Sequence, residues 1–213
     1  MIPLYEQSSG DKIAPQYSPA AVIAKKIEEG EEFDVAITNP GALDKFPKLG
    51  VVLMQPLLVV GVNSVLLVHK IGAPKPDIST PEALKATLLS AKAISFSDPA
   101  AGGGSSNYFM SVVEAIGITA QVKEKAIITK PAEAAFPVAD GRAEIGVSQT
   151  SEAAMASGVE TQPLNPSDPK SSSVYSAAIS SKSQQLDASR TFVGFMSSPT
   201  GLAIRRAKGL APL

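Results

Sequence analysis

Short runs of β-branched and other apolar residues alternate with segments of helical spacing along most of this chain. A chain of this kind folds most simply as an α/β protein, because each helix can cover the strands before and after it. We therefore predict an α/β fold with mostly parallel sheet. The predicted strands are residues 33–38, 62–68, 93–96, 126–129, 144–148 and 174–179, and the predicted helices are residues 18–30, 80–90, 105–116, 132–139, 150–156, 183–197 and 199–208.

The composition of the chain excludes several classes of function. Its 213 residues are enough for one large domain, or for two of about 100 residues each. The net charge of −1 comes from 19 basic and 20 acidic residues without a basic run, which argues against a nucleic-acid surface. The absence of cysteine excludes a thiolate nucleophile, a cysteine-based zinc site and a disulfide framework.

Catalytic and cofactor motifs are also missing from the sequence. His69 is the sole histidine, and it lies in an apolar strand run, where a packed histidine is more common than a general base. No G-x-S-x-G motif surrounds any serine, and no spacing of His, Asp and Glu suggests a metal site. The glycine-rich stretch Gly102–Ser106 lacks the lysine of a P-loop. We therefore predict a protein that is not an enzyme and that uses no metal or other cofactor.

The segment Ser95–Tyr108 gives the strongest indication of function. A predicted strand ends there in a turn pair and three glycines, and Ser105, Ser106 and Asn107 then begin a predicted helix. The unpaired N–H groups of a first helical turn, the serine hydroxyls and the helix macrodipole together favour a bound anion. The alternative is a glycine-rich turn that Ser105 or Ser106 caps for structural reasons.

Polar residues follow three of the predicted strands at the points where the strands end. Asn39 follows the first strand, Ser105–Asn107 follow another, and Gln149 with Thr150 follow a third. The carboxyl ends of parallel strands meet at one edge of a sheet, where open α/β sheets bind their ligands. We therefore predict a crevice lined by uncharged hydrogen-bond donors, although hydroxyl groups also cap helices for purely structural reasons.

The sequence also bears on the location of the protein. No apolar run reaches the roughly 20 residues that cross a bilayer. The first residues, Met1–Glu6, lack the basic region of a secretory signal. We therefore expect either an exported protein whose signal segment has been removed or a protein of the cytosol.

Five segments, taken together, resemble the periplasmic solute-binding proteins of the molybdate-binding type. The segments follow the order in which they occur in that family and cover nearly the whole chain. They are residues 24–37, 73–85, 98–108, 143–152, and 198–199 with 207–212.

The resemblance implies a two-lobed periplasmic-binding-protein type II fold, in which two mostly parallel sheets flanked by helices are joined by two crossing strands. Residues 62–70 and 174–179 would be the crossing strands. Lobe 1 would contain residues 1–66 and 174–213, and lobe 2 would contain residues 67–173.

The same resemblance implies a function in transport. The protein would capture a small anion, either molybdate-like or organic, in a cleft between the lobes and deliver it to an ABC permease complex in the membrane. It would be periplasmic or extracellular, and it would be a monomer, or a dimer in which a partner chain replaces the family's first strand, which would lie before Met1. An enzyme or a cytosolic ligand sensor on the same scaffold is the alternative.

The resemblance also implies which residues bind the ligand. Ser105 falls on the family's contact at a helix start, Ser148–Thr150 fall on its next contact, and Tyr175 falls on its tyrosine. Ser18 stands alone and displaced from the family's serine pair, and each lost hydroxyl donor weakens the binding of a buried dianion about tenfold or more. The predicted ligand-binding residues are Ser18, Asn39, Ser105, Ser106, Asn107, Gln149, Thr150 and Tyr175.

Overall fold

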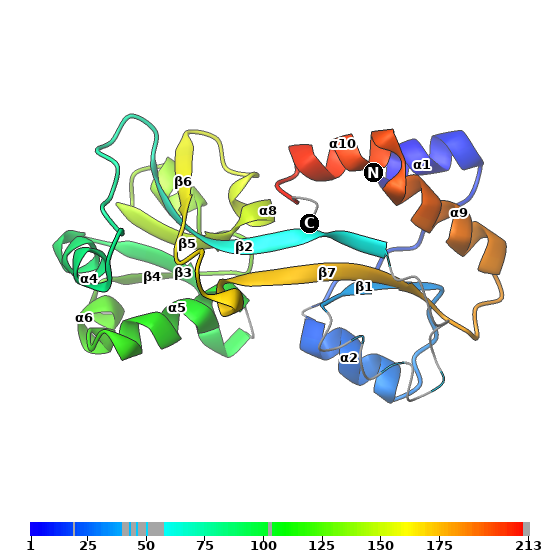
Figure 1. Ribbon diagram of the computed structural model, residues 1–213, viewed down its shortest axis with the longest axis horizontal. Coiled ribbons are helices and arrows are strands. Elements are labelled where there is room, and N and C mark those ends of the chain that lie inside the picture. Colours follow the sequence, from blue (N-terminus) through cyan, green and yellow to red (C-terminus); the bar gives the residue numbers. More distant parts are fainter. Residues whose placement is uncertain are drawn as a thin grey trace. The chain divides into compact units, whose positions relative to one another are not determined.

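The chain divides into two compact units, whose helices and strands are labelled in Figure 1. Each unit has an apolar core of its own. Unit 1 is Met1–Val62 with Ser173–Leu213, and unit 2 is Asn63–Ser172. Strand β2 (Leu58–Lys70) begins in unit 1 and continues into unit 2, and strand β7 (Ser172–Ile179) begins at the last residue of unit 2. The computed structural model describes residues 1–18, 20–39, 43, 46, 50, 58–101 and 104–210.

Unit 2 contains a mixed sheet in the strand order β2-β5-β3-β4. Strand β3 runs parallel to β4 and β5, as predicted, because helices cross over between these strands. Strand β2 runs antiparallel to β5 and to β6, so the sheet is not mostly parallel. The α/β class is confirmed, whereas the alternation of elements did not determine the direction of β2. The strands are β3 (Ile94–Ser97), β4 (Ala126–Thr129), β5 (Ile145–Gln149) and β6 (Val159–Pro163).

Helices cover both faces of this sheet (Figure 1). On one face, α4, α5 and α6 pack Leu88, Phe109 and Val122 onto Phe96 of β3 and Val147 of β5. The other face is covered by α7 and α8 in a smaller cluster that includes the β2 residues Leu66 and Val68. The helices are α4 (Pro81–Ser90), α5 (Gly104–Ala115), α6 (Thr119–Glu124), α7 (Phe136–Ala139) and α8 (Thr150–Ala153).

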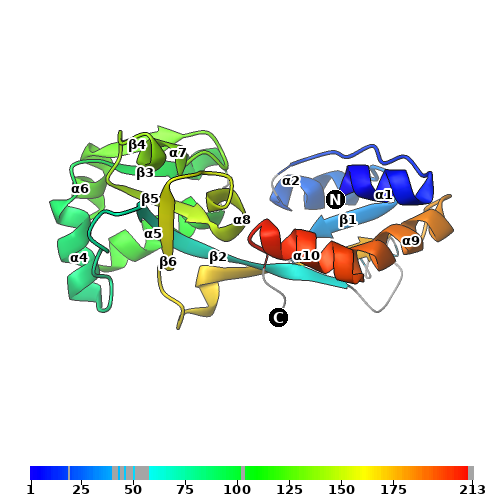
Figure 2. The same cartoon turned by 90° about the horizontal axis from the view of Figure 1, so that it is seen from above.

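Unit 1 is built on the antiparallel pair of β1 and β7, in which Val35 lies opposite Ile179 and Thr38 opposite Ser176. Both views show α9 leading into α10 with α1 alongside (Figures 1 and 2). Tyr5 of α1 and Phe192 of α9 are in edge contact within the core. The elements are α1 (Ile2–Ser9), α2 (Ala20–Glu28), β1 (Val35–Thr38), α9 (Leu186–Ser197) and α10 (Pro199–Ala207).

Several helix boundaries confirm the sequence signals. Helix α4 begins at Pro81, and the Thr80 Oγ1 accepts a hydrogen bond from the N–H of Ala83 at 3.1 Å. The helix predicted over residues 132–139 forms only from Phe136, and its predicted first residue, Ala132, has a φ of 67° in the left-handed region, where no right-handed helix can begin. No described helix is long and apolar enough to cross a membrane.

Candidate functional site

Helix α5 begins beside the carboxyl ends of β3 and β5, where the sequence places its glycine-rich loop. Its first turn contains no acidic residue, so the positive end of the helix dipole is not neutralised from within the helix. Ser105 and Ser106 are buried, with 3% and 0% of their surfaces exposed, whereas Asn107 is exposed. The side chains of Ser105 and Ser106 are therefore buried at this edge of the sheet, whereas the Asn107 amide is exposed to solvent.

The two serines of this turn have different surroundings. Ser106 is tied to the sheet, because the Ser97 Oγ at the end of β3 donates a hydrogen bond to the Ser106 Oγ at 3.3 Å. The Ser105 Oγ has no hydrogen-bond partner among the described residues. The Ser105 Oγ is also not one of the fully buried polar atoms that lack a partner in the described residues, so this hydroxyl can donate to water or to a bound acceptor.

Gln149 ends β5 and packs against the start of α5. It is 8% exposed, and its Oε1 accepts a hydrogen bond from the Asn63 Nδ2 at 2.8 Å. Its Nε2 lies so close to Gly104 that a Cβ on that glycine would be 3.2 Å away. This Nε2 donates to no acceptor in the described parts of the chain. The structure therefore brings Gln149 and the Ser105 turn together, as predicted from their positions after two strands.

Thr150 lies at the same edge of the sheet, but its hydroxyl is hydrogen-bonded to the backbone of β2. The Thr150 Oγ1 accepts a hydrogen bond from the N–H of Ser64 and donates one to the carbonyl of Ser64, both at 3.1 Å. Asn63 holds the next residue, because its Oδ1 accepts from the N–H of Ser151 at 3.0 Å and its Nδ2 donates to the Ser151 Oγ at 2.9 Å. These bonds fix the start of α8 on β2.

Asn63 is therefore a part of the site that the sequence reasoning missed, whereas Ser64 holds Thr150 through its backbone groups alone. The only signal for Asn63 is that two polar residues interrupt the apolar run of β2. Asn63 is 5% exposed, and a buried amide in a strand requires hydrogen-bond partners from elsewhere in the fold. The sequence does not show those partners, because they lie 86 and 88 residues away.

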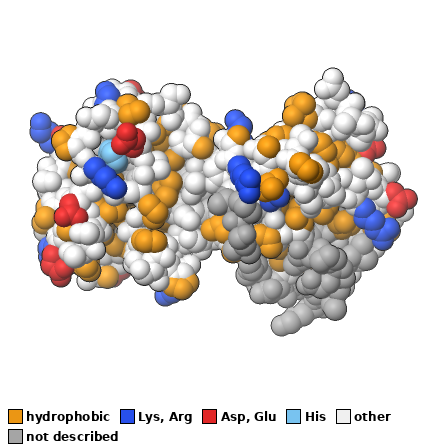
Figure 3. Space-filling model, turned by 45° about the horizontal axis from the view of Figure 1, so that its top comes forward, with side chains coloured by type: hydrophobic (Ala, Val, Ile, Leu, Met, Phe, Trp, Pro, Cys, Tyr) orange, Lys and Arg blue, Asp and Glu red, His pale blue; other side chains and the backbone are white. Residues whose placement is uncertain are grey.

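Two described carboxylates lie near this edge: Asp98, which is exposed and directly follows β3, and Glu152, which is partly buried in α8. The Glu152 Oε2 accepts hydrogen bonds from the N–H of Gln149 and from the Ser148 Oγ, both at 3.2 Å. Burial raises the pKa of Glu152, and the two hydrogen bonds oppose that change. None of the described lysines or arginines is hydrogen-bonded to these residues, and charged side chains are scattered among uncharged ones on the face of unit 2 seen in Figure 3.

We use the name α5 donor cluster for the N–H groups of the first turn of α5, the Ser105 Oγ and the Gln149 Nε2. All of these groups donate hydrogen bonds, and none of them carries a full charge. Such a set is suited to an anion or to another ligand rich in acceptor oxygens, and it provides no nucleophile activated by a base.

The other predicted ligand-binding residues belong to unit 1. Ser18 is partly exposed and precedes α2, and Asn39 directly follows β1. Tyr175 lies in β7 and packs against the core cluster of Tyr5 and Phe192. At the end of β1, Thr38 is fully buried, and its Oγ1 has no hydrogen-bond partner among the described residues.

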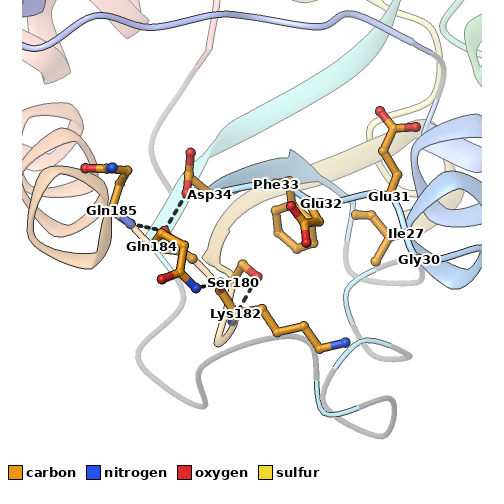
Figure 4. A pocket seen from close by; sticks show the side chains of 11 residues that line it. Ile27, Gly30, Glu31, Glu32, Phe33, Asp34, Ser180, Lys182, Gln184 and Gln185 are labelled. Carbon is orange, nitrogen blue, oxygen red and sulfur yellow. Dashed lines mark hydrogen bonds between the residues drawn. The ribbon is translucent and has the colours of Figure 1, made fainter.

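A separate hollow of about 310 Å³ lies in unit 1, at the end of β1 opposite to Asn39 (Figure 4). Among the described residues that line it, Glu31, Glu32 and Asp34 carry carboxylates and Lys182 carries the one cation. This excess of negative charge does not suit an anion. None of the predicted ligand-binding residues lines the hollow.

His69 lies near the end of β2. His69 is 3% exposed, and its ring contacts the carbonyl of Lys70 at 3.3 Å and the Glu160 carboxylate at 3.9 Å. It is therefore a packed residue of β2, as predicted. Among the described residues, no group of three or more His, Asp or Glu side chains could hold a metal ion.

Comparison with known proteins adds a family and a fold. The model of a family described as bacterial extracellular solute-binding protein matches residues 1–211. The periplasmic molybdate-binding protein of Azotobacter vinelandii superposes with a TM-score of 0.70 at 16% identity, over 100% of this chain and 92% of that one. Iron-bound HitA from Pseudomonas aeruginosa gives a TM-score of 0.68 at 15% identity, over 97% and 78%. The fold is thus found with chemically different ligands.

A curated relative is an enzyme. It is an aconitate isomerase from a Pseudomonas species, 29% identical over 216 residues, which cover 99% of this chain and 81% of the relative.

Proposed function

Because the chain belongs to the bacterial extracellular solute-binding proteins, we propose that it captures a small anion for an ABC permease complex, and that the α5 donor cluster holds this anion. The ligand class would be an oxyanion such as molybdate or sulfate, or a small carboxylate. All such ligands present several acceptor oxygens to uncharged donors. A periplasmic or extracellular location and a permease partner are parts of this proposal.

The observation that carries the proposal is the set of unused donors at the start of α5. The Ser105 Oγ and the Gln149 Nε2 belong to residues that are at least nine-tenths buried, and neither group finds an acceptor among the described residues. The first turn of α5 beside them adds backbone N–H groups, which have no partner within the helix, and the positive end of the helix dipole. Neither group is among the fully buried polar atoms without a partner in the described residues, so both can donate to a ligand or to water.

Unit 1 contributes predictions rather than observed contacts. Ser18, Asn39 and Tyr175 remain predicted ligand-binding residues, and the lobe boundaries after residues 66 and 173 remain a prediction. For Thr150 we propose a supporting role, because its hydroxyl is engaged by Ser64.

A thermal-shift panel tests the proposed function. Molybdate, tungstate, sulfate, phosphate and small carboxylates are added separately to the protein, and the melting temperature is recorded. A ligand that binds only the folded state raises this temperature by mass action. At 100 times the dissociation constant, the stabilisation of roughly 2.7 kcal/mol corresponds to a rise of roughly 5–10 °C. No rise with any anion of the panel would contradict the proposal.

A second candidate function is isomerisation of an unsaturated polycarboxylate, which the similarity to an aconitate isomerase favours. Moving a proton between two carbons of such a substrate needs an acid–base group. Glu152 is placed for this role, since burial raises its pKa and its carboxylate lies against Gln149. Proton NMR of cis-aconitate incubated with the protein decides the matter, with Glu152→Gln as the control. If the unaltered protein converts cis-aconitate and Glu152→Gln does not, the isomerase function is supported. If the unaltered protein does not convert cis-aconitate, the isomerase function is excluded.

A further inference from the structure

Both polar atoms of the Asn63 side chain are hydrogen-bonded. It is the first residue of unit 2, it is 5% exposed, and it interrupts an apolar strand. The Oδ1 accepts from the N–H of Ser151, and the Nδ2 donates to both the Ser151 Oγ and the Gln149 Oε1, at distances of 2.8–3.0 Å. A polar side chain with three short hydrogen bonds in this position is held in one orientation.

The orientation of the Asn63 amide follows from the backbone. The N–H of Ser151 can only donate, so the group that faces it must be the Asn63 oxygen. The Asn63 nitrogen then faces Gln149, and Gln149 turns its own oxygen toward Asn63. The N–H of Glu152 favours the same orientation, because it faces the Gln149 oxygen in a capping box. The Gln149 nitrogen is consequently left on the other side, where it packs against Gly104, the first residue of α5.

We propose that Asn63 is a positioning residue that makes Gln149 present a donor, and not an acceptor, to the α5 donor cluster. This inference rests on the proposed function. With the amide of Gln149 reversed, an oxygen would face the ligand, and an anion would meet a partial negative charge in place of an N–H group. Asn63 touches no ligand in this scheme and acts only through Gln149.

The test is Asn63→Asp, which keeps the shape of the side chain and removes its donor. The new carboxylate still accepts from the N–H of Ser151, but it can only accept from Gln149. This favours turning the Gln149 nitrogen toward residue 63, against the capping-box contact between the Gln149 oxygen and the N–H of Glu152. Binding of molybdate and of sulfate is measured by isothermal titration calorimetry. The loss of one hydrogen bond to a charged ligand predicts a dissociation constant roughly 10 to 100 times larger for the anion that the unaltered protein binds.

Because Asn63→Asp also adds a negative charge, a double-mutant cycle of Asn63→Ala and Gln149→Ala supplies a neutral comparison. If Asn63 acts through Gln149, then Asn63→Ala weakens binding in the unaltered protein and has no further effect when Gln149 is already alanine. Equal effects of Asn63→Ala in the two backgrounds would overturn the proposal. Melting temperatures without anion establish that each variant is folded.

Ser64→Ala is the matched control on the same strand. It removes the contact between the Ser64 Oγ and the Ser172 Oγ at 3.0 Å and leaves Gln149 untouched, so the dissociation constant should stay within about twofold. If the unaltered protein binds an anion and Asn63→Asp binds it equally well, the proposed role of Asn63 is overturned and the anion site is not. No binding of either anion by the unaltered protein would overturn both the role of Asn63 and the anion site at α5.

Discussion

Ser105 and Ser106 are neighbours in the sequence and both are buried, yet their hydroxyl groups have different surroundings. The hydroxyl of Ser106 is bonded to Ser97, whereas that of Ser105 has no described partner. A helical turn rotates successive side chains by about 100°, so adjacent serines face different elements. One hydroxyl can therefore join the helix to the sheet while the next is available to a ligand.

This difference predicts opposite effects for two single substitutions. Ser105→Ala should weaken anion binding about tenfold or more and change the melting temperature of the free protein little. Ser106→Ala should lower the free energy of unfolding by about 1 kcal/mol, because it removes a buried hydrogen bond. Calorimetric titration and urea unfolding of both variants measure the two effects. Equal anion affinity in Ser105→Ala and the unaltered protein would show that the hydroxyl of Ser105 is not a ligand contact.

Glu152 predicts a dependence of stability on pH. Burial raises its pKa above the 4.5 of an unperturbed group, so the folded state binds this proton more tightly than the unfolded state does. The free energy of unfolding should then fall as the pH rises from the unfolded pKa through the folded one. Urea unfolding between about pH 4 and pH 7 should show a flatter profile for Glu152→Gln than for the unaltered protein. Identical profiles would mean that Glu152 has an ordinary pKa.

Sequence reasoning reached some residues of the site and not others. Ser105 and Gln149 could be predicted because each follows a strand, and strand ends in α/β sheets meet at one edge. Asn63 could not be predicted, since its role depends on tertiary hydrogen bonds to residues 86 and 88 positions away. The hydrogen bond between the Thr150 hydroxyl and the N–H of Ser64 could not be predicted for the same reason.

At the scale of elements, two glycines near the α9–α10 junction have contrasting surroundings. Gly194 lies exposed in α9, where an added Cβ would meet no atom within 4 Å. Gly201 lies buried in the first turn of α10, where a Cβ would clash with the carbonyl oxygens of Phe195 and Met196. The close approach of the two helices therefore depends on the missing side chain at Gly201.

The two glycines form a matched pair for stability measurements. Gly194→Ala should raise the free energy of unfolding by about 0.5–1 kcal/mol, because alanine lowers the entropy of the unfolded chain and favours a helix. Gly201→Ala should lower it by about 1–3 kcal/mol or more through overpacking. Urea titrations of both variants provide the values. A Gly201→Ala protein as stable as the unaltered one would mean that the two helices do not approach this closely.

Most elements could be predicted from the sequence, because caps and periodicity act locally. Thr80 and Pro81 set the start of α4 at the predicted residue. The short elements α1, α6 and β6 were not predicted, since they carry weak periodicity and form through packing onto the rest of their units. The antiparallel direction of β2 was missed because the alternation of strands and helices does not show which strands become neighbours in the sheet, and β2 pairs with β5 and β6, which lie far away in the sequence.

At the scale of the whole molecule, family membership and fold agree, and the chemistry of the ligand is the open question. The family model covers residues 1–211, but proteins of this fold include both a molybdate-binding protein and an iron-bound one. A fold does not determine its ligand. The choice of an anion for this chain therefore rests on the donors at α5, and two lobes that close on a ligand remain a prediction.

The most direct measurement is calorimetric titration of the unaltered protein and of Ser105→Ala with the anion that gives the largest thermal shift. The account predicts saturable binding of one anion per chain, and a dissociation constant about tenfold or more larger for the variant. Binding of equal strength in both proteins, or heat from neither with any anion of the panel, would contradict the claim that uncharged donors at the start of α5 hold the ligand.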